Sequence, residues 1–153
     1  LGHQTSYTGH SLGGGLASAA AANTNAKGTT FNAAGLHTNT VNHKQSSAEI
    51  DAYYVPGDAL STLQDNREGV LAGGLVAATA ASPRAGLHLA YNTAKNELSG
   101  KKALPRAAGR RIPLPVAMPP GKSGMTYYNP VSRHGMDWVQ EGISKEMEAN
   151  GCQ

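Results

Sequence analysis

The pentapeptide Gly9-His10-Ser11-Leu12-Gly13 constrains the fold of this 153-residue chain more than any other feature. It fits the pattern G-x-S-x-G, in which a serine sits on a strained turn between a strand and a helix. Gly9 and Gly13 let the backbone pass through the turn without clashing. The turn raises the Ser11 hydroxyl above the surface and places the Leu12 N–H at a helix N-terminus, where it can stabilise an oxyanion. The motif therefore predicts Ser11 as a nucleophile and the Leu12 N–H as an oxyanion donor.

The sequence around this motif fits a strand before it and a helix after it. The short polar and β-branched run Gln4–Thr8 predicts a strand, and the small apolar residues of Leu12–Ala22 predict a helix packed closely on a sheet. Two more strands are expected at Thr29–Asn32 and at Ile50–Val55, the second stopped by Pro56-Gly57. This order indicates an α/β domain with a mainly parallel sheet.

The second half of the chain is less regular in sequence. A helix is expected at 69–81, although its adjacent glycines weaken that prediction. Residues 82–125 contain six of the eight prolines. We expect this segment to be irregular, apart from a short helix at 88–98 and a short edge strand at 111–116.

The C-terminal segment His134–Asn150 is predicted to be a helix. Its apolar residues recur at spacings of three, four and four, which places them on one stripe. They are Met136, Val139, Ile143 and Met147. Gly151 follows at a position that suits a helix C-cap.

A serine hydroxyl needs a general base and an orienting carboxylate before it can attack a carbonyl group. Where the nucleophile lies on an elbow between a strand and a helix, as predicted here, the acid and then the histidine follow it in the chain. Asp58 lies just past a predicted strand, directly behind Pro56-Gly57, and is the predicted acid. Asp51 lies at the wrong end of that strand, and Asp65 lies in a polar turn. Asp137 comes after the best histidine rather than before it.

His134 is the predicted base. It lies in a loop directly before the C-terminal helix, from which an imidazole can reach across to the serine. Of the other candidates, two precede the acid, one lies in the irregular segment, and one lies inside the motif and is expected to point elsewhere. These are, in that order, His37, His43, His88 and His10.

Four segments resemble class 3 lipases, in which GHSLGG is followed by a helix of small residues. Thr8–Ala17 is similar to their elbow, and Thr30–Leu36 is similar to the next strand of bacterial members. Tyr54–Leu60 resembles the loop that carries their acid, and Arg133–Asp137 resembles the loop that carries their histidine. The best-matching relatives are lipase-like domains of bacterial effector toxins, including phospholipases delivered by type VI secretion.

The resemblance implies an α/β-hydrolase fold and hydrolysis of lipid carboxylic esters, of phospholipase A type, through an acyl-enzyme. It implies a triad of Ser11, His134 and Asp58, with an oxyanion bound by the Leu12 N–H and an upstream donor. Expected partners are a lipid or phospholipid at a membrane surface and an immunity or inhibitor protein. An effector of this kind would be secreted from a bacterium and would act on target-cell membranes.

In the α/β-hydrolase fold, strands and an oxyanion loop precede the elbow, whereas eight residues precede Gly9 in this sequence. We therefore expect residues 1–153 to be the C-terminal part of a lipase-like catalytic domain, incomplete before the elbow strand. The upstream part would be a partner, on the same chain or on a separate one. Residues 69–125 would form an irregular insertion or a lid over the acyl pocket. The alternatives are a non-catalytic fragment, which needs an N-terminal half or binds an inhibitory partner, and a peptidase with the same triad.

Composition argues against several other classes of function. The net charge is +3, and Lys101-Lys102 and Arg110-Arg111 are isolated doublets, so no nucleic-acid partner is expected. The single cysteine, Cys152, allows neither an internal disulfide nor a cysteine metal site. The six histidines lack metal-ligand spacing and the acidic residues do not cluster, so neither a metal nor another cofactor is expected. No apolar run approaches the ~20 residues of a membrane span.

Overall fold

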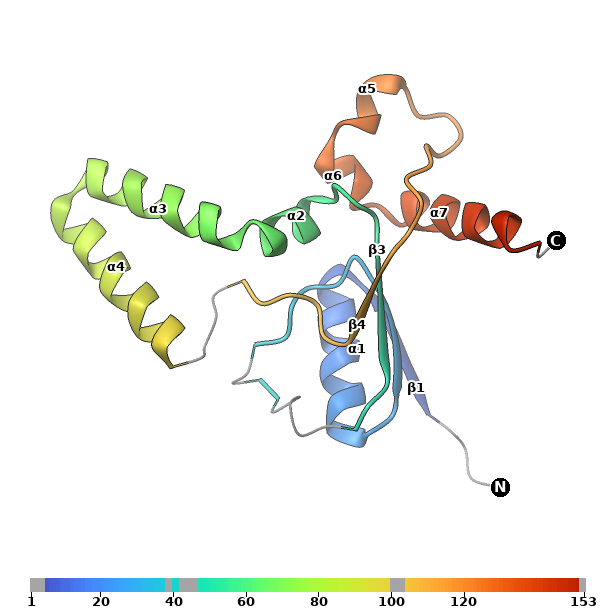
Figure 1. Cartoon of the computed structure of the whole chain (residues 1–153), viewed down its shortest axis with the longest axis horizontal. Helices are drawn as coiled ribbons and strands as arrows, with labels where there is room; N and C mark the ends of the chain where they lie inside the picture. The colour runs from blue at the N-terminus through green and yellow to red at the C-terminus, as the bar shows by residue number, and fades with distance from the viewer. Residues whose placement is uncertain (1–4, 38–39, 42–46, 100–103, 152–153) are drawn as a thin grey trace.

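Four parallel strands form one sheet within the residues that the computed structural model describes, namely 5–37, 40–41, 47–99 and 104–151 (Figure 1). They are β1 (Ser6–His10), β2 (Lys27–Phe31), β3 (Ile50–Tyr54) and β4 (Arg110–Pro113), side by side in chain order. The expected α/β class with a parallel sheet is confirmed. Because all four strands run in the same direction, the segments that follow them meet at one edge of the sheet.

The strand boundaries differ from the expected ones by a few residues. β1 continues to His10 instead of ending at Thr8, so the strand leads directly into Ser11. β2 begins two residues before the expected Thr29, and β3 stops at Tyr54. Several residues that entered the predictions lie outside the described ranges: Gln4, His43, Cys152 and the Lys101-Lys102 doublet.

Helix α1 (Ser11–Thr24) covers one face of the sheet through its small residues. A Cβ atom added at Gly14 would lie 2.7 Å from the Ala33 Cβ, and one added at Gly28 would lie 3.3 Å from the Ala21 Cβ. The helix therefore sits closer to the strands than larger side chains would permit. The buried core on this side consists of Ala21, Leu36, Ile50 and Ala108.

Helix α7 (Met136–Ala149) contributes a second core. Its fully buried residues Trp138 and Val139 pack with Val55 and Leu114, and the aromatic pair Phe31 and Tyr53 joins them. Since Phe31 and Tyr53 neighbour the α1-side positions in their strands, they point to the opposite face of the sheet.

The predicted apolar stripe of this last helix is found in part. Val139 is buried, and Met136 and Ile143 are partly buried against the second core. Met147 is 48% exposed, because it lies near the end of the helix. The sequence pattern had not singled out Trp138, which is the largest fully buried side chain.

The second half of the chain follows the sequence prediction in part. The helix expected at 69–81 is α3 (Arg67–Ala81), the one expected at 88–98 is part of α4 (Pro83–Leu98), and the edge strand expected at 111–116 is β4. α2 (Ala59–Asp65), between β3 and α3, was not predicted. α3 and α4 pack against each other as a hairpin that extends away from the sheet (Figure 1). α4 starts five residues earlier than expected because Pro83 occupies its first turn, a position that proline favours.

Two short helices, α5 (Gly124–Tyr127) and α6 (Pro130–Arg133), connect β4 to α7 at the carboxyl edge of the sheet (Figure 1). Asn129 caps α6 by accepting hydrogen bonds from the N–H groups of Val131 and Ser132. Within the described part of the chain, none of the helices combines the length and the hydropathy that crossing a bilayer would require.

Candidate active site

Ser11 begins α1 in a left-handed backbone conformation, with φ 55°. Only glycine adopts this region without strain, so a serine held there marks a constrained turn. The Ser11 carbonyl accepts a hydrogen bond from the Ala34 N–H at 2.8 Å, which ties the turn to the segment after β2. This is the geometry expected of a serine raised between a strand and a helix.

Gly9 and Gly14 are the two glycines of this turn at which a side chain would clash. A Cβ atom at Gly9 would lie 2.3 Å from the Gly13 carbonyl oxygen, a distance that no real side chain tolerates. A Cβ atom at Gly13 would meet nothing within 4 Å. The prediction that a side chain would clash in this turn is therefore correct for Gly9. It is wrong for Gly13, and the second clash occurs at the neighbouring Gly14 instead.

Asp58 lies at the carboxyl end of β3, where a tight turn delivers it to the first turn of α2. The Asp58 N–H donates to the Val55 carbonyl at 3.0 Å, and Gly57 has φ +80°, which together match a type II turn with Pro56 at its second position. The carboxylate is fully buried and caps α2, since its Oδ2 accepts the Ser61 N–H at 2.8 Å. One carboxylate oxygen is thus fixed by the helix, and Oδ1 remains for another partner.

His134 bridges the other two predicted residues. The Ser11 Oγ and the His134 Nε2 are 2.7 Å apart, and the His134 Nδ1 and the Asp58 Oδ1 are 2.5 Å apart. A buried carboxylate accepts the Nδ1–H, which leaves Nε2 as the acceptor for the serine hydroxyl. Residues 123 positions apart in the chain therefore form one continuous hydrogen-bonded path. The His134 side chain is 26% exposed, so the path is open to solvent on one side.

Asn32 and His10 hold the backbone of the His134 loop. The Asn32 side chain donates to the carbonyl oxygens of Arg133 and His134, both at 3.3 Å, and accepts the Val55 N–H at 2.9 Å. His10 also donates its Nε2–H to the His134 carbonyl, at 2.7 Å. His10 was expected to point elsewhere. Instead its ring lies 4.9 Å from that of His134, measured between centroids.

Arg133 joins the acid turn to the histidine loop. Its Nε–H donates to the Tyr127 carbonyl at 2.6 Å, and its Nη1–H donates to the Pro56 carbonyl at 2.9 Å. The guanidinium group also lies over the Tyr127 ring, 4.6 Å from its centroid. Gly57 leaves room for it, because a Cβ atom there would lie 2.3 Å from Nη1. Sequence reasoning missed this role, although Arg133 directly precedes the predicted base.

The carboxylates that were ranked below Asp58 have other partners. Asp51 pairs with Arg110 at 2.9 Å on the sheet, and Asp65 pairs with Arg111 at 2.6 Å at the end of α2. Asp137 accepts the Trp138 N–H at the start of α7 and pairs with Lys122 at 3.0 Å. His88 lies on the exposed side of α4. His43 lies outside the described residues, and His37 lies in the segment after β2.

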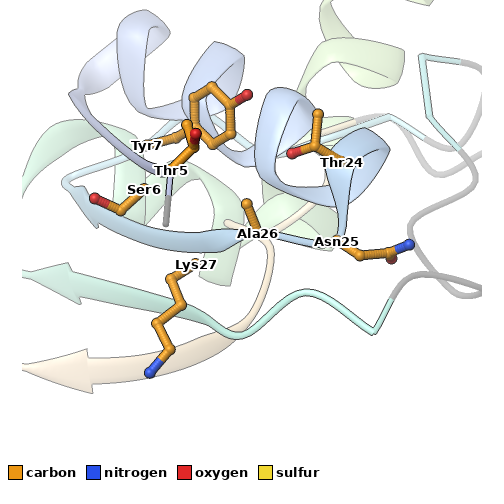
Figure 2. Close-up of a pocket in the computed structure, with 7 residues that line it drawn as sticks. All are labelled: Thr5, Ser6, Tyr7, Thr24, Asn25, Ala26 and Lys27. Atoms are coloured by element: carbon orange, nitrogen blue, oxygen red, sulfur yellow. The ribbon is translucent and has the colours of Figure 1, made fainter. Parts of the chain in front are cut away.

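A surface pocket lies at the opposite end of the sheet from Ser11 (Figure 2). It is formed where β1 and β2 begin and α1 ends, and it is lined by Thr5, Ser6, Tyr7, Thr24, Asn25, Ala26 and Lys27. Figure 2 shows the Tyr7 ring beside α1 and the Lys27 side chain pointing away from that helix. None of the predicted site residues lines this pocket, so the candidate site is the hydrogen-bonded path at the carboxyl edge.

Comparison with known families gives one match. A family model described as a Tle-like phospholipase domain, of the phospholipase-like group, matches residues 1–117. The matched region includes Ser11 and Asp58 and ends before His134. No curated protein matches the chain.

Proposed function

The chain belongs to the Tle-like phospholipase domain family, and on this premise we propose that it is a serine hydrolase of phospholipid carboxylic esters. Family membership indicates a lipid-hydrolysing enzyme. The observation that supports the serine mechanism is the path from the Ser11 Oγ through the His134 imidazole to the Asp58 carboxylate. A peptidase could use the same triad, but the family description favours a lipid substrate.

In the proposed mechanism, the Ser11 Oγ attacks the acyl carbonyl while the His134 Nε2 takes the hydroxyl proton. Asp58 keeps the proton on Nδ1 and stabilises the imidazolium that forms. His134 then gives its proton to the leaving glycerol oxygen, and an acyl-enzyme remains on Ser11. A water molecule, deprotonated by His134, attacks the acyl-enzyme and releases a fatty acid. The products are one fatty acid and one lysophospholipid, which corresponds to phospholipase A chemistry.

The N-terminus of α1 is the proposed oxyanion site. The first N–H groups of a helix lack intrahelical partners, and the Leu12 N–H follows the nucleophile directly. The His10 side chain, at the N-cap position, bonds to the His134 carbonyl instead of capping this turn. The Leu12 N–H is therefore proposed as one oxyanion donor, and a second donor would come from upstream sequence.

The edge position of β1 supports the proposal that another part of the hydrolase pairs with this sheet. β1 has β2 on one side and no other described strand on its second side. Such an edge presents unpaired backbone groups that suit a further strand. We propose that the upstream part of the same hydrolase, on this chain or another, occupies the edge. An effector role, with a cognate inhibitor protein and action on target-cell membranes, is the corresponding biological proposal.

Active-site labelling tests the mechanism without requiring the natural substrate. A fluorophosphonate probe should label the protein at Ser11, and Ser11→Ala or His134→Ala should abolish labelling. Ser144→Ala and His88→Ala are matched controls, because both residues are exposed and lie on other helices. Release of fatty acid and lysophospholipid from phosphatidylcholine, lost in Ser11→Ala, then tests the substrate class.

The labelling result also separates the non-catalytic alternative. If the chain alone is unlabelled and upstream sequence restores labelling, the chain is a fragment that needs its N-terminal half. If neither form is labelled, the serine mechanism is wrong. If labelling occurs but only peptide substrates are cleaved, the protein is a peptidase.

A further inference from the structure

The outward side of α4 carries an apolar stripe with cations beside it. Leu87, Tyr91 and Leu98 are 74%, 65% and 90% exposed, and together with exposed Ala94 they recur at helical spacing along one side. Arg84 and Lys95 are exposed on the same side. A shallow hollow lies on this stripe, lined by Tyr91, Ala94, Lys95, Leu98 and Ser99. We call this set of residues the α4 stripe.

The inner side of α4 is already occupied by α3. Gly86 lies so close to α3 that a Cβ atom there would come within 2.8 Å of the Thr79 Cα. Arg67 at the start of α3 pairs with Glu97 at the end of α4, at 3.2 Å. The two helices therefore form one packed arm, and the α4 stripe is one side of that arm that lacks a packing partner among the described residues.

Charge is distributed unevenly along the sequence. The arm itself carries three Lys or Arg and two acids, a formal charge of +1, and seven further basic residues follow it up to Arg133. Residues 69–136 contain nine Lys or Arg and a single acid, Glu97, which gives a formal charge of +8. The remaining residues contain four Lys or Arg and nine acids, which gives −5. Within the described part of the chain, neither Arg84 nor Lys95 has an ion-pair partner. The α4 stripe thus combines apolar side chains with two unpaired cations and no acid.

We propose that the α4 stripe docks the protein on an anionic phospholipid surface. A helix that presents exposed apolar residues flanked by Lys or Arg has the character of an interfacial helix, which buries its apolar side chains at the headgroup boundary. A lipid surface is favoured over a protein partner for two reasons. The charged residues of the α4 stripe, Arg84 and Lys95, are both basic, and the chain belongs to a phospholipase family. In this respect the inference rests on the proposed function.

The position of the arm fits this role. α2, which leads into α3, begins immediately after Asp58, so the arm leaves the sheet at the edge that carries the candidate site. Figure 1 shows α3 extending from that edge, away from β1, and α4 turning back from the far end of α3. Docking through α4 would keep the protein at the bilayer without changing the path of hydrogen bonds at Ser11.

Vesicle flotation of Ser11→Ala protein tests docking apart from hydrolysis. Binding to equimolar phosphatidylcholine and phosphatidylglycerol vesicles is compared with binding to phosphatidylcholine vesicles. Adding Leu87→Ser and Tyr91→Ser, or Arg84→Glu and Lys95→Glu, should each weaken binding to the anionic vesicles at least tenfold. Met147→Ser and Lys27→Glu change exposed residues on α7 and β2, away from the stripe, and should leave binding unchanged. Equal binding by all variants would overturn the proposal.

A tryptophan reporter gives a second measurement that does not depend on losing a function. Tyr91→Trp should shift its fluorescence to shorter wavelength on anionic vesicles, while Trp138 is fully buried and contributes a constant background. No shift would contradict docking through α4, and so would stripe-dependent capture by an acidic protein without vesicle binding. If vesicles bind through the stripe but are hydrolysed neither by the unmodified protein nor by a form that includes upstream sequence, docking stands and the proposed function fails. If vesicles are hydrolysed and the stripe variants do not slow hydrolysis, the proposed function stands and docking through the α4 stripe fails.

Discussion

Two residues in strained backbone conformations lie next to each other at the carboxyl edge of the sheet. Ser11 (φ 55°) follows the last residue of β1, and Asn32 (φ 42°) follows the last residue of β2. Because His10 and Phe31 are partners in the parallel register, the two strained residues occupy equivalent places on adjacent strands. Each such residue costs on the order of 1–3 kcal/mol. Both side chains engage the His134 loop, so the strain falls where the candidate site is assembled.

The elbow glycines offer a paired test at this scale. Gly9→Ala places a methyl group 2.3 Å from a backbone oxygen that cannot move away, so we expect a loss of roughly 3 kcal/mol in unfolding free energy. Gly13→Ala meets nothing within 4 Å and improves helix propensity, so we expect a gain of roughly 0.5–1 kcal/mol. Urea denaturation of both variants measures the difference. Equal destabilisation by the two substitutions would contradict the described turn.

Asn32 is predicted to matter for both stability and reactivity. Asn32→Ala leaves the Val55 N–H without its partner and puts alanine in a left-handed conformation, with a combined cost of roughly 2–4 kcal/mol. It also removes the Asn32 hydrogen bonds to the carbonyl groups of Arg133 and His134, so the probe should label Ser11 more slowly even when the variant is folded. Labelling rates measured well below the unfolding midpoint test this. A normal rate would mean that His10 alone positions the loop.

At the scale of elements, Arg133 connects the turn before α2 to the segment that carries α5 and α6. In Arg133→Lys, a single ammonium group replaces the planar guanidinium group whose Nε–H and Nη1–H donate to the Tyr127 and Pro56 carbonyls. About 2 kcal/mol of unfolding free energy should therefore be lost. We expect labelling of Ser11 to slow roughly tenfold, because Asp58 and His134 lie on the two connected segments. The control is Arg110→Lys, an exposed pair with Asp51, which should change neither quantity. An unchanged labelling rate in Arg133→Lys would contradict this role.

The elements that sequence reasoning located best are those with a strong local pattern. The strand-turn-helix around Ser11 and the strand Ile50–Tyr54 follow from glycine placement and from clustered β-branched and aromatic residues. α2 was missed because Asp58 was interpreted only as a catalytic acid. Aspartate is also a favoured helix N-cap residue, and the Asp58 carboxylate accepts the Ser61 N–H in the first turn of α2. The helix expected at 88–98 was placed five residues too late, because the Ser82-Pro83 start of α4 was overlooked.

The residues of the candidate site also differ in whether sequence reasoning could identify them. The three residues of the hydrogen-bonded path could be chosen from chain order and position relative to strands, and the structure brings them together. Asn32 and His10 could not be chosen, because their roles depend on contacts with a loop over 100 residues away. Neither residue belongs to a spacing pattern that marks such a role. Local chemistry thus identifies the proposed reacting groups, whereas tertiary packing determines which residues position them.

For the whole molecule, the separation of charge matters more than the net charge of +3. Within the basic 69–136 segment, four residues pair with acids of the remainder, namely Arg106, Arg110, Arg111 and Lys122. Arg84 and Lys95 on α4 have no ion-pair partner among the described residues, so an anionic surface would turn the molecule until the α3–α4 arm approaches it first. The carboxyl edge of the sheet, with Ser11, leads into that arm through α2.

This orientation predicts a dependence on ionic strength that differs between substrates. Raising salt from about 0.01 M to about 0.1 M shortens the Debye length from about 30 Å to about 10 Å, which weakens attraction between separated charges. Hydrolysis of vesicles containing phosphatidylglycerol should therefore slow several-fold, whereas hydrolysis of a soluble short-chain ester should not change. Arg84→Glu with Lys95→Glu should remove most of the salt effect on vesicles and leave the soluble reaction intact. The same salt dependence on neutral phosphatidylcholine vesicles would instead assign the effect to the reaction at Ser11, since no surface charge would then be available to orient the protein.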